Sequence, residues 1–541
     1  MTQRIVRFGV VACALAALAV VSVLPAAGQA PAPVPKPGGV LRLVHREDLP
    51  QGFAIHESAT NSVTWPAMPC YSNLVVFDQL KPVERPETIV SELAEKWSWQ
   101  DNYRNLVFFL RKDVKWHDGQ PFTSKDVKFT YDVVREAKDA PAKLRLNPRK
   151  EWYTNVEAIE APDAYTVVFR LKRPQPSLLT ILASGYSPVL PAHVPLAEHR
   201  SRCIGTGPFK MKEWRRGEFV ELVKNPDFFV KGRPYLDTIR YVVVVERGTR
   251  VAALQSGQVD VAYPGDTTVP MMQQLKAAVP TMVFTETPTN VSENILINTR
   301  KAPFDNVKVR RALSLAIDRR AYTTAVHQGS AIIGASLLPK PKGVWGLIEK
   351  EVAQLPGYGK AAEDKERAKK LLAEVGYGPG KPLKVEMATR AIASYLDFAS
   401  FVINEVKLIG VDATLKQVET AQWHPLATRR EFELAANLTG LGVDDPDANF
   451  YENYACGSPR NYGDYCNEEV MKLIEQQSQE LDPAKRMAQV AQIQRKLEED
   501  GARPTMGWRV DRFAHHTYVK NLVPHQVVYN CCRLQETWLD K

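Results

Sequence analysis

The sequence predicts an α/β protein with more than one domain. Strand-like runs rich in valine, isoleucine and phenylalanine alternate along the chain with segments whose apolar residues recur at helical spacing. The length of 541 residues exceeds what one hydrophobic core ordinarily supports, so we expect two or three domains. With 45% apolar and 24% charged residues, the composition is that of a folded soluble protein.

The N-terminus has the pattern of a secretory signal peptide. Arg4 and Arg7 precede an uncharged apolar run over residues 8–24, and small residues follow that run. We expect residues 1–29 to be removed on export and residues 30–39 to form a linker rich in proline and glycine. The alternative is an uncleaved membrane anchor, because the run is at the lower length limit for a bilayer span.

Short strands dominate the first third of the chain. The runs 40–44 and 105–110 have the β-branched and aromatic residues of strands, and the segment 156–171 predicts two more around a turn. A helix is expected to begin near Ser124, where Thr123 stands three residues before an aspartate as in a capping box.

The middle of the chain alternates between the two element types. The continuous β-branched run at 239–245 predicts a strand buried on both faces. A helix over about 250–257 ends near Gly257. Another helix is predicted near 309–317, with Asp305 or Asn306 as its N-cap.

The last third continues the alternation. Strands are expected at 385–388 and 413–418, on either side of a helix near 396–408. Another helix over 367–375 is closed by a glycine. A final long helix is capped by Asp482, and four of its residues form one apolar stripe: Met487, Val490, Ile493 and Leu497.

The cysteines suggest one disulfide bond. Export would place them in an oxidising compartment. Cys456 and Cys466 bracket a short segment of glycine, proline and asparagine and form the best pair. The adjacent Cys531 and Cys532 lack the spacing of a metal or redox motif, which favours structural bonding. The sequence leaves the pairing of four further cysteines open: Cys70, Cys203, Cys531 and Cys532.

Several function classes lack their signature residues. The sequence contains no G-x-S-x-G, H-E-x-x-H or paired C-x-x-C motif, so we expect no catalytic residues, no metal site, no cofactor and no enzyme activity. The net charge of +9 includes no basic run interleaved with aromatics, so we expect no nucleic-acid partner.

Four motifs occurring in order resemble one known family. They are LRKDVKWHDGQPFTSKDVKFTY at 110–131, IGTGPFKMKEWRRGEFVELVKNPDFF at 204–229, VRRALSLAIDRRAY at 309–322 and AKKLLAEVGYG at 368–378. Over nearly its whole mature length the chain is similar to the family 5 extracellular solute-binding proteins of ABC importers. That family includes receptors for oligopeptides, dipeptides, nickel, opines and oligosaccharides.

The resemblance implies a two-lobed periplasmic-binding-protein fold of type II, cluster C, with a small extra domain inserted in the first lobe. The expected ranges are 40–73, 205–292 and 506–541 for the first lobe, 74–204 for the inserted domain and 293–505 for the second lobe. Ligand would bind in the cleft between the lobes.

The resemblance also points to ligand-binding residues. Asp444 and Asp445 concentrate charge in a loop, although capping of a helix explains such aspartates equally well. Trp423 follows a predicted strand where relatives place ligand contacts. The remaining candidates offer an amide or an aromatic face, with core packing as their alternative role: Asn437, Trp65, Tyr71 and Trp508.

One departure concerns the recognition of a peptide N-terminus. In peptide-binding relatives an aspartate four residues before the corresponding proline binds the α-ammonium group, and here Gly442 occupies that position. An aspartate nearby in the same loop could replace the lost charge from a shifted position.

The sequence therefore predicts a monomeric periplasmic receptor that binds a small soluble peptide or peptide-like solute and delivers it to the permease and ATPase subunits of an ABC importer. The alternatives are a receptor for an opine, an oligosaccharide or another polar solute, and, from other classes, a secreted chaperone-like peptide binder or a hydrolase.

Overall fold

The computed structural model describes residues 34–541, of which Lys36–Lys541 form one compact unit. The predicted signal peptide over residues 1–29 lies outside the described residues, as does the first part of the predicted linker. Within the part of the chain that is described, no helix has both the length and the apolar character needed to cross a membrane.

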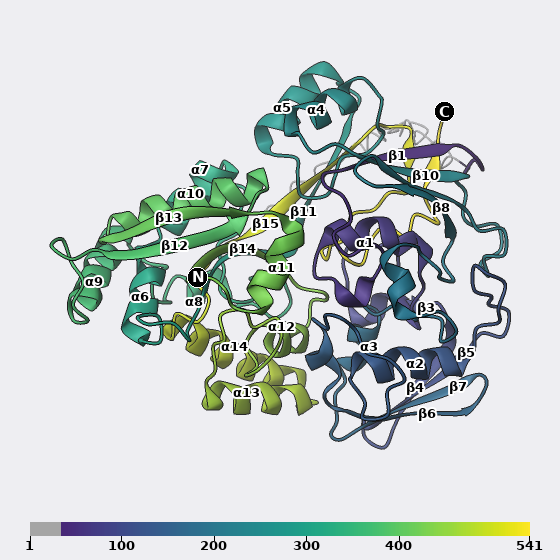
Figure 1. The fold of residues 1–541 in the computed structure, drawn as a ribbon, viewed down its shortest axis with the longest axis horizontal. Helices are drawn as coiled ribbons and strands as arrows, with labels where there is room; N and C mark the ends of the chain where they lie inside the picture. Colours follow the sequence, from purple (N-terminus) through teal and green to yellow (C-terminus); the bar gives the residue numbers. More distant parts are fainter. Residues whose placement is uncertain (1–33) are drawn as a thin grey trace, which may run out of the picture. The chain divides into compact units, whose positions relative to one another are not determined.

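A four-stranded sheet contains the first strand of the chain (Figure 1). Its order is β1 (Val40–His45), β10 (Thr238–Val243), β9 (Phe219–Lys224) and β8 (Phe209–Arg215). β1 runs parallel to β10, and the other pairs are antiparallel.

The prediction that both faces of the strand near 239–245 are buried is wrong. In β10, Ile239 and Tyr241 are buried while Arg240 and Val242 between them are partly exposed, and Val245 beyond the strand is 74% exposed. One face of the strand packs on the core and the other meets solvent, as is common in a largely antiparallel sheet.

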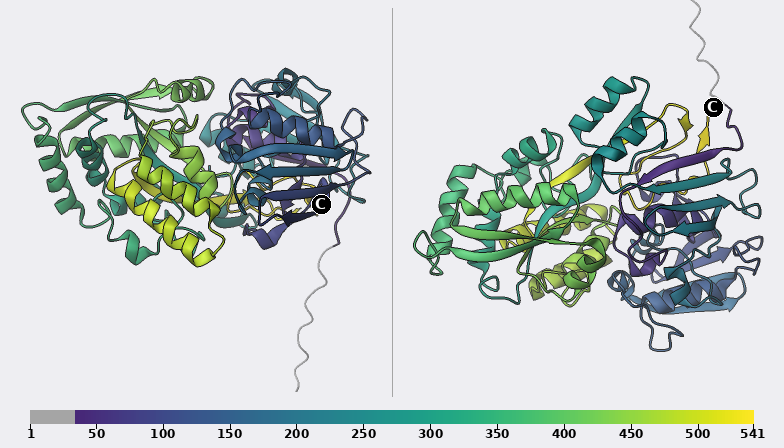
Figure 2. Two further views of the ribbon diagram at one scale, coloured as in Figure 1. Left: turned by 90° about the horizontal axis from the view of Figure 1, so that it is seen from below. Right: turned by 45° about the horizontal axis from the view of Figure 1, so that its top comes forward.

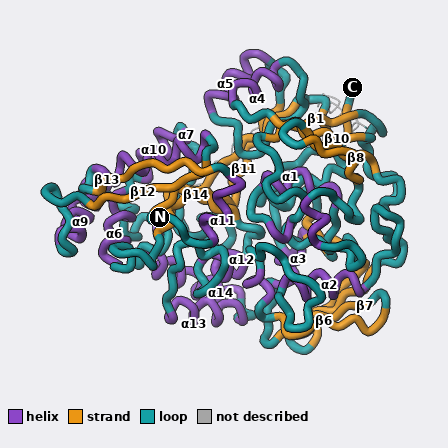
Figure 3. The backbone as a smooth tube through the Cα atoms, in the orientation of Figure 1, coloured by secondary structure: helices purple, strands orange, loops and turns teal. Residues whose placement is uncertain are grey.

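A second sheet of five strands has helices packed against it (Figure 3). Its order is β13 (Val411–Val418), β12 (Leu383–Arg390), β14 (Leu434–Gly440), β11 (Val283–Ile297) and β15 (Thr505–His515). The associated helices include α6 (Val307–Ala316), α7 (Arg319–His327), α9 (Ala361–Ala373) and α10 (Ala393–Lys407). Their apolar residues form a core cluster separate from that of the first sheet.

Two long strands connect the regions predicted as lobes. β11 pairs antiparallel with β15 from Val283 to Asn294, and its second half also pairs with β14. The predicted lobe boundaries at 292/293 and 505/506 fall within these two strands, so the chain crosses between the lobes along a paired β-ribbon. The positions of the boundaries themselves stay predictions.

A third sheet, also of four strands, lies within residues 74–204, the range predicted for the inserted domain. Its order is β4 (Ala94–Gln100), β5 (Asn105–Leu110), β7 (Thr166–Leu171) and β6 (Val156–Asp163). Helix α2 (Ser124–Val134) packs on β6 and β7 and begins with the predicted capping box, in which the Thr123 backbone N–H donates to Asp126 at 2.9 Å.

Shorter elements complete the fold. The remaining helices are α1 (Asn61–Ala67), α3 (Leu178–Leu182), α4 (Arg247–Gln255), α5 (Val269–Ala278), α8 (Glu349–Val352), α11 (Thr420–Thr428), α12 (Pro446–Asn453), α13 (Glu468–Gln479) and α14 (Pro483–Glu499). The remaining strands are β2 (Val75–Phe77), β3 (Ile89–Ser91), β16 (Val519–Lys520) and β17 (Trp538–Leu539). Helices α13 and α14 pack side by side (Figure 2).

Local capping signals act as the sequence predicts. Asn306 caps α6 by accepting from the Lys308 backbone N–H at 2.9 Å, and Asp482 caps α14. The predicted disulfide bond between Cys456 and Cys466 is present, and a second one joins the adjacent Cys531 and Cys532.

Candidate functional site

The candidate site is a cavity of about 60 Å³. Its wall combines segments from both predicted lobes with residues of the connecting strands. The first-lobe residues are Arg46, Ala59, Thr60, Asn61, Tyr263, Pro264, Gly265, Val528 and Tyr529. The second-lobe residues are Arg390, Tyr395, Trp423, His424, Asn437, Leu438, Gly440, Arg460 and Tyr462, and the connecting strands add Val291, Arg509 and Asp511.

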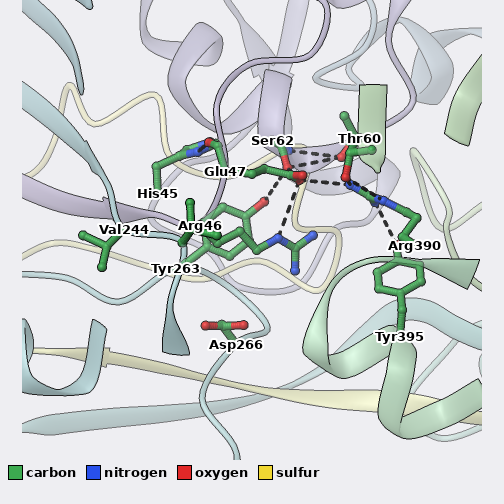
Figure 4. A network of polar contacts seen from close by, with 12 residues as sticks. His45, Arg46, Glu47, Thr60, Ser62, Val244, Tyr263, Asp266, Arg390 and Tyr395 are labelled. Atoms are coloured by element: carbon green, nitrogen blue, oxygen red, sulfur yellow. Dashed lines mark hydrogen bonds and ion pairs between the residues drawn. The ribbon is translucent and has the colours of Figure 1, made fainter. Parts of the chain in front are cut away.

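An arginine–glutamate–arginine cluster lies on one side of the cavity (Figure 4). Glu47 follows β1, and its carboxylate lies 2.9 Å from Arg390 Nη2 at the end of β12 and 3.8 Å from Arg46 Nε. Burial opposes ionisation of Glu47, but Arg390, Arg46 and a hydrogen bond from Ser62 outweigh it and lower the pKa of Glu47 to about 2. One carboxylate thus serves two guanidinium groups, which belong to different predicted lobes.

The two arginines of this cluster differ in how their hydrogen-bonding capacity is used. The Arg390 guanidinium donates to Glu47, to Tyr395 Oη at 3.0 Å and to Thr420 Oγ1 at 2.7 Å. The Arg46 side chain, 10% exposed, stacks on Tyr263 with its guanidinium carbon 4.6 Å from the ring centre. Its guanidinium donates no hydrogen bond to any residue in the described part of the chain, so these donors remain available to a ligand.

A second cluster of the same composition joins the predicted inserted domain to α12. The Glu452 carboxylate lies 2.9 Å from Arg460 Nε and 3.4 Å from Arg149 Nε, and Arg149 and Glu452 are each 1% exposed. The Arg149 guanidinium also stacks on Tyr186 at 3.9 Å. Arg460 lines the cavity and brings the charge of this cluster to its wall.

The remaining charged groups of the wall form a balanced pair. Arg509 Nε lies 3.2 Å from Asp511 Oδ1 on β15, and the Arg509 guanidinium also donates to the carbonyl of Gly265.

His424 on α11 lines the cavity, and neither ring nitrogen has a hydrogen-bond partner among the described residues. Burial and the nearby Arg390 and Arg460 lower the pKa of His424 well below its usual value, so the ring is neutral.

Two of the residues singled out from the sequence lie on the cavity wall. Trp423 on α11 and Asn437 on β14 both line it. The Asn437 side-chain amide donates to Thr439 Oγ1 at 3.0 Å, which fixes the amide and leaves its oxygen available as an acceptor.

Three of the aromatic candidates lie in the core instead. Trp65 packs edge-on against Phe513 at 5.7 Å, and Tyr71 Oη is hydrogen-bonded to His199 Nδ1 at 2.8 Å. Trp508 is fully buried and donates from Nε1 to the carbonyl of Ala335 at 2.9 Å. None of the three is among the cavity-lining residues.

Asp444 and Asp445 also lie away from the cavity wall. Asp445 caps α12 and forms an ion pair with Arg486 at 2.7 Å. Asp444, with a side chain 7% exposed, has only long contacts, to Arg85 Nη1, the Val344 backbone N–H and Gln526 Nε2 at 3.4 Å each. Burial raises the pKa of Asp444 to about 6.

The raised pKa of Asp444 predicts a pH-dependent stability. A carboxyl group that holds its proton more tightly when folded stabilises the protein fully below its unfolded pKa near 4, and this stabilisation is lost as pH rises through about 6. We expect Asp444→Asn to abolish that loss. As pH rises from 4 to 7, the free energy of unfolding of the variant should therefore increase by about 3 kcal/mol relative to that of the parent. Urea titrations of both proteins across this range measure the difference, and a constant difference would contradict the assignment.

The space beside Gly442 is filled by an aromatic ring. A Cβ atom at this position would lie 3.0 Å from Trp152 Cζ2, closer still to Cη2, and 3.2 Å from Ser184 Oγ. Trp152 is 1% exposed and is held by a hydrogen bond from Nε1 to the carbonyl of Ala448 at 3.0 Å. An acidic side chain therefore cannot project from position 442 unless Trp152 moves.

The arginines of the wall were missed by reasoning from sequence. Two of them follow a simple rule, since Arg46 comes directly after β1 and Arg390 is the last residue of β12. In open α/β sheets ligands bind outside the carboxyl ends of strands, so the position of these two arginines at strand ends could have predicted them as site residues. Arg460 and Arg509 have no comparable local signal.

Comparison with known proteins identifies the family. A model described as "Bacterial extracellular solute-binding proteins, family 5 Middle" matches residues 88–461. A "Putative ABC transporter peptide-binding protein" of Brucella ovis is 31% identical over 332 residues, which are 59% of this chain and 57% of that protein. The chain thus matches a little over half the length of this relative. The dipeptide-binding protein of Escherichia coli K12 is 26% identical over 487 residues, 83% and 85% of the two chains.

The solved structures share the fold. The DppA periplasmic binding protein of Helicobacter pylori, in complex with the peptide STSA, matches with a TM-score of 0.83 at 22% identity, covering 94% of this chain and 99% of that one. This similarity confirms the predicted two-lobed α/β fold. Because the family model spans more than half of the chain, this protein belongs to the family 5 bacterial extracellular solute-binding proteins.

Proposed function

We propose that this protein is the periplasmic receptor of an ABC importer and that it binds a peptide or peptide-like solute in the arginine-lined cavity. The observation that carries the proposal is the construction of the cavity wall from both predicted lobes, with the β11–β15 ribbon connecting them. The names of the Brucella and Escherichia coli relatives support peptides as the solute class.

The proposed mechanism is capture by closure of the lobes. A solute that contacts both walls binds the closed arrangement more tightly than the open one and shifts the population toward it. Trp423 offers an apolar face and Asn437 an amide oxygen from the second lobe, while Arg46 and Asn61 offer donors from the first. The closed receptor, acting as a monomer, then delivers the solute to the permease, and partner subunits supply the energy by ATP hydrolysis.

Identification of the bound solute tests the proposal. We expect purified protein to release a small peptide-like molecule on denaturation, detected by mass spectrometry, and the same compound at 100 times its Kd to stabilise the protein by about 2.7 kcal/mol. Recovery of the compound unchanged after prolonged incubation separates a receptor from a hydrolase. The proposal fails if no peptide, opine or oligosaccharide in a thermal-shift screen raises the melting temperature, or if the compound is consumed.

A further inference from the structure

The groups that form the cavity wall carry more positive than negative charge. Each of the two arginine–glutamate–arginine clusters contains two guanidinium groups and one carboxylate, so each has an excess positive charge of one. Asp511 is the one carboxylate among the described cavity-lining residues, and it is already paired with Arg509. The wall therefore has two positive charges without a protein counterion.

We propose that the solute is a dianion, a peptide-like compound with two acidic groups and no free ammonium group, and that it supplies the missing counterion to each cluster. This inference rests on the proposed function and names the chemical class of its solute. The reason is energetic: a buried guanidinium without a counterion is costly, and an acidic group at hydrogen-bond distance removes that cost.

Arg46 is the strongest single indication. Its side chain is nine-tenths buried and borders the cavity, and its guanidinium makes no hydrogen bond to the described protein. The nearest carboxylate oxygen, on Glu47, is 3.8 Å away and lies closer to Arg390. Its Nε is a buried donor without an acceptor, which indicates an absent partner, and a carboxylate matches the planar geometry of the guanidinium.

His424, another residue of the cavity wall, supports the same assignment. Both of its ring nitrogens lack hydrogen-bond partners among residues 34–541, although the side chain is buried against the cavity. A neutral imidazole has one N–H donor, and an acidic group between Arg460 and this ring would accept from both. The charged groups facing His424 are the two clusters themselves, so an anion entering there is attracted from both sides.

Among the described cavity-lining residues the one carboxylate, Asp511, is already paired with Arg509, although its Oδ1 accepts no hydrogen bond. A free α-ammonium in the cavity would lie among guanidinium groups, with like charges repelling it. The solute class is therefore acidic rather than zwitterionic.

The arrangement also couples charge to closure. In the first cluster Arg46 and Arg390 come from different predicted lobes and share Glu47, and in the second Arg149 and Arg460 share Glu452 across the same division. Closure brings like charges together, and a dianion offsets this repulsion only in the closed arrangement. A neutral solute of the same shape lacks that differential affinity and shifts the population less.

A matched series of ligands tests the inference on the parent protein after removal of bound material. The probes are N-acetyl-Ala-Glu, N-acetyl-Ala-Gln, N-acetyl-Ala-Gln amide and Ala-Lys amide, which are similar in size and run from two negative charges to positive charge. We expect titration calorimetry to show affinity falling about 10- to 100-fold for each carboxylate replaced by an amide, because charge-assisted hydrogen bonds are lost. Equal or tighter binding of the neutral or cationic probes overturns the dianion assignment while leaving the receptor function intact. If none of the four probes binds although the thermal-shift screen finds another ligand, the dianion assignment fails and the receptor function stands.

Variants at Arg46 test the residue itself. We expect Arg46→Gln to weaken binding of the dianion about 10- to 100-fold and to leave binding of the neutral probe unchanged, whereas Arg46→Lys keeps part of the charge-dependent affinity. The control is Arg429→Gln, which removes an exposed guanidinium paired with Glu431 and should change neither affinity. An unchanged melting temperature shows that each variant is folded. Unaltered dianion affinity in Arg46→Gln overturns the proposal.

Discussion

Replacing Glu452 by glutamine is expected to lower the free energy of unfolding by about 3–5 kcal/mol. The carboxylate is buried between Arg149 and Arg460, at 3.4 and 2.9 Å, and is the shared counterion of both. Glutamine has a similar shape but no charge, so it leaves two buried guanidinium groups facing each other without compensation. Removing one partner of a buried ion pair destabilises a protein much more than replacing the whole pair by apolar residues of similar volume.

A urea titration followed by tryptophan fluorescence measures this effect. The control is Glu431→Gln, since Glu431 pairs with Arg429 on the surface and a solvent-screened exposed pair should contribute little to stability. Adding Arg460→Gln to Glu452→Gln returns the cluster to its original excess charge of one, and we expect part of the lost stability to be recovered. If Glu452→Gln costs no more than Glu431→Gln, the cluster does not hold the predicted inserted domain to α12 as described.

Substitution of Gly442 is expected to give the other large effect. Even Gly442→Ala places a Cβ atom within 3.0 Å of the Trp152 ring, which is buried and held by its hydrogen bond to Ala448. Overpacking of this kind costs about 1–3 kcal/mol. Gly442→Asp should cost more, because it adds a buried carboxylate beside an indole ring.

A double-mutant cycle identifies the cause. Trp152→Ala alone should cost about 3–5 kcal/mol through the cavity it creates, and in that background Gly442→Ala should cost almost nothing because the obstruction is gone. The control is Gly380→Ala, at a glycine whose Cβ would meet no atom within 4 Å. Full additivity of the Gly442 and Trp152 substitutions would show that the ring is not what excludes a side chain from position 442.

These two predictions concern features that differ in how far the sequence reveals them. The glycine at 442 and its departure from the family pattern are visible in the sequence, but the indole that fills its place comes from a residue 290 positions earlier. The shared counterion Glu452 lies in a helix next to a predicted capping loop, and no sequence pattern near it predicts that Arg149 is its partner.

The same contrast holds for the elements and the aromatic candidates. Caps such as Asn306 and Asp482 are correct because a side chain bonding a backbone N–H two or three residues away is a local interaction. The burial of β10 was misjudged because a β-branched run does not reveal whether a second layer covers its outer face. Trp65 and Trp508 could be placed only once their neighbours were known, because an aromatic side chain serves a core and a binding site equally well.

Short-range patterns and motifs in order were enough to predict the α/β class, the family, the disulfide between Cys456 and Cys466 and helices such as α2, α6 and α14. Which charges meet at the cavity depends on the tertiary structure. Arg46 lies 344 residues before Arg390 and 414 before Arg460, and the role of each arginine depends on which carboxylates it shares and which it lacks. Electrostatic balance is a property of distances in space, which spacing along the chain does not encode.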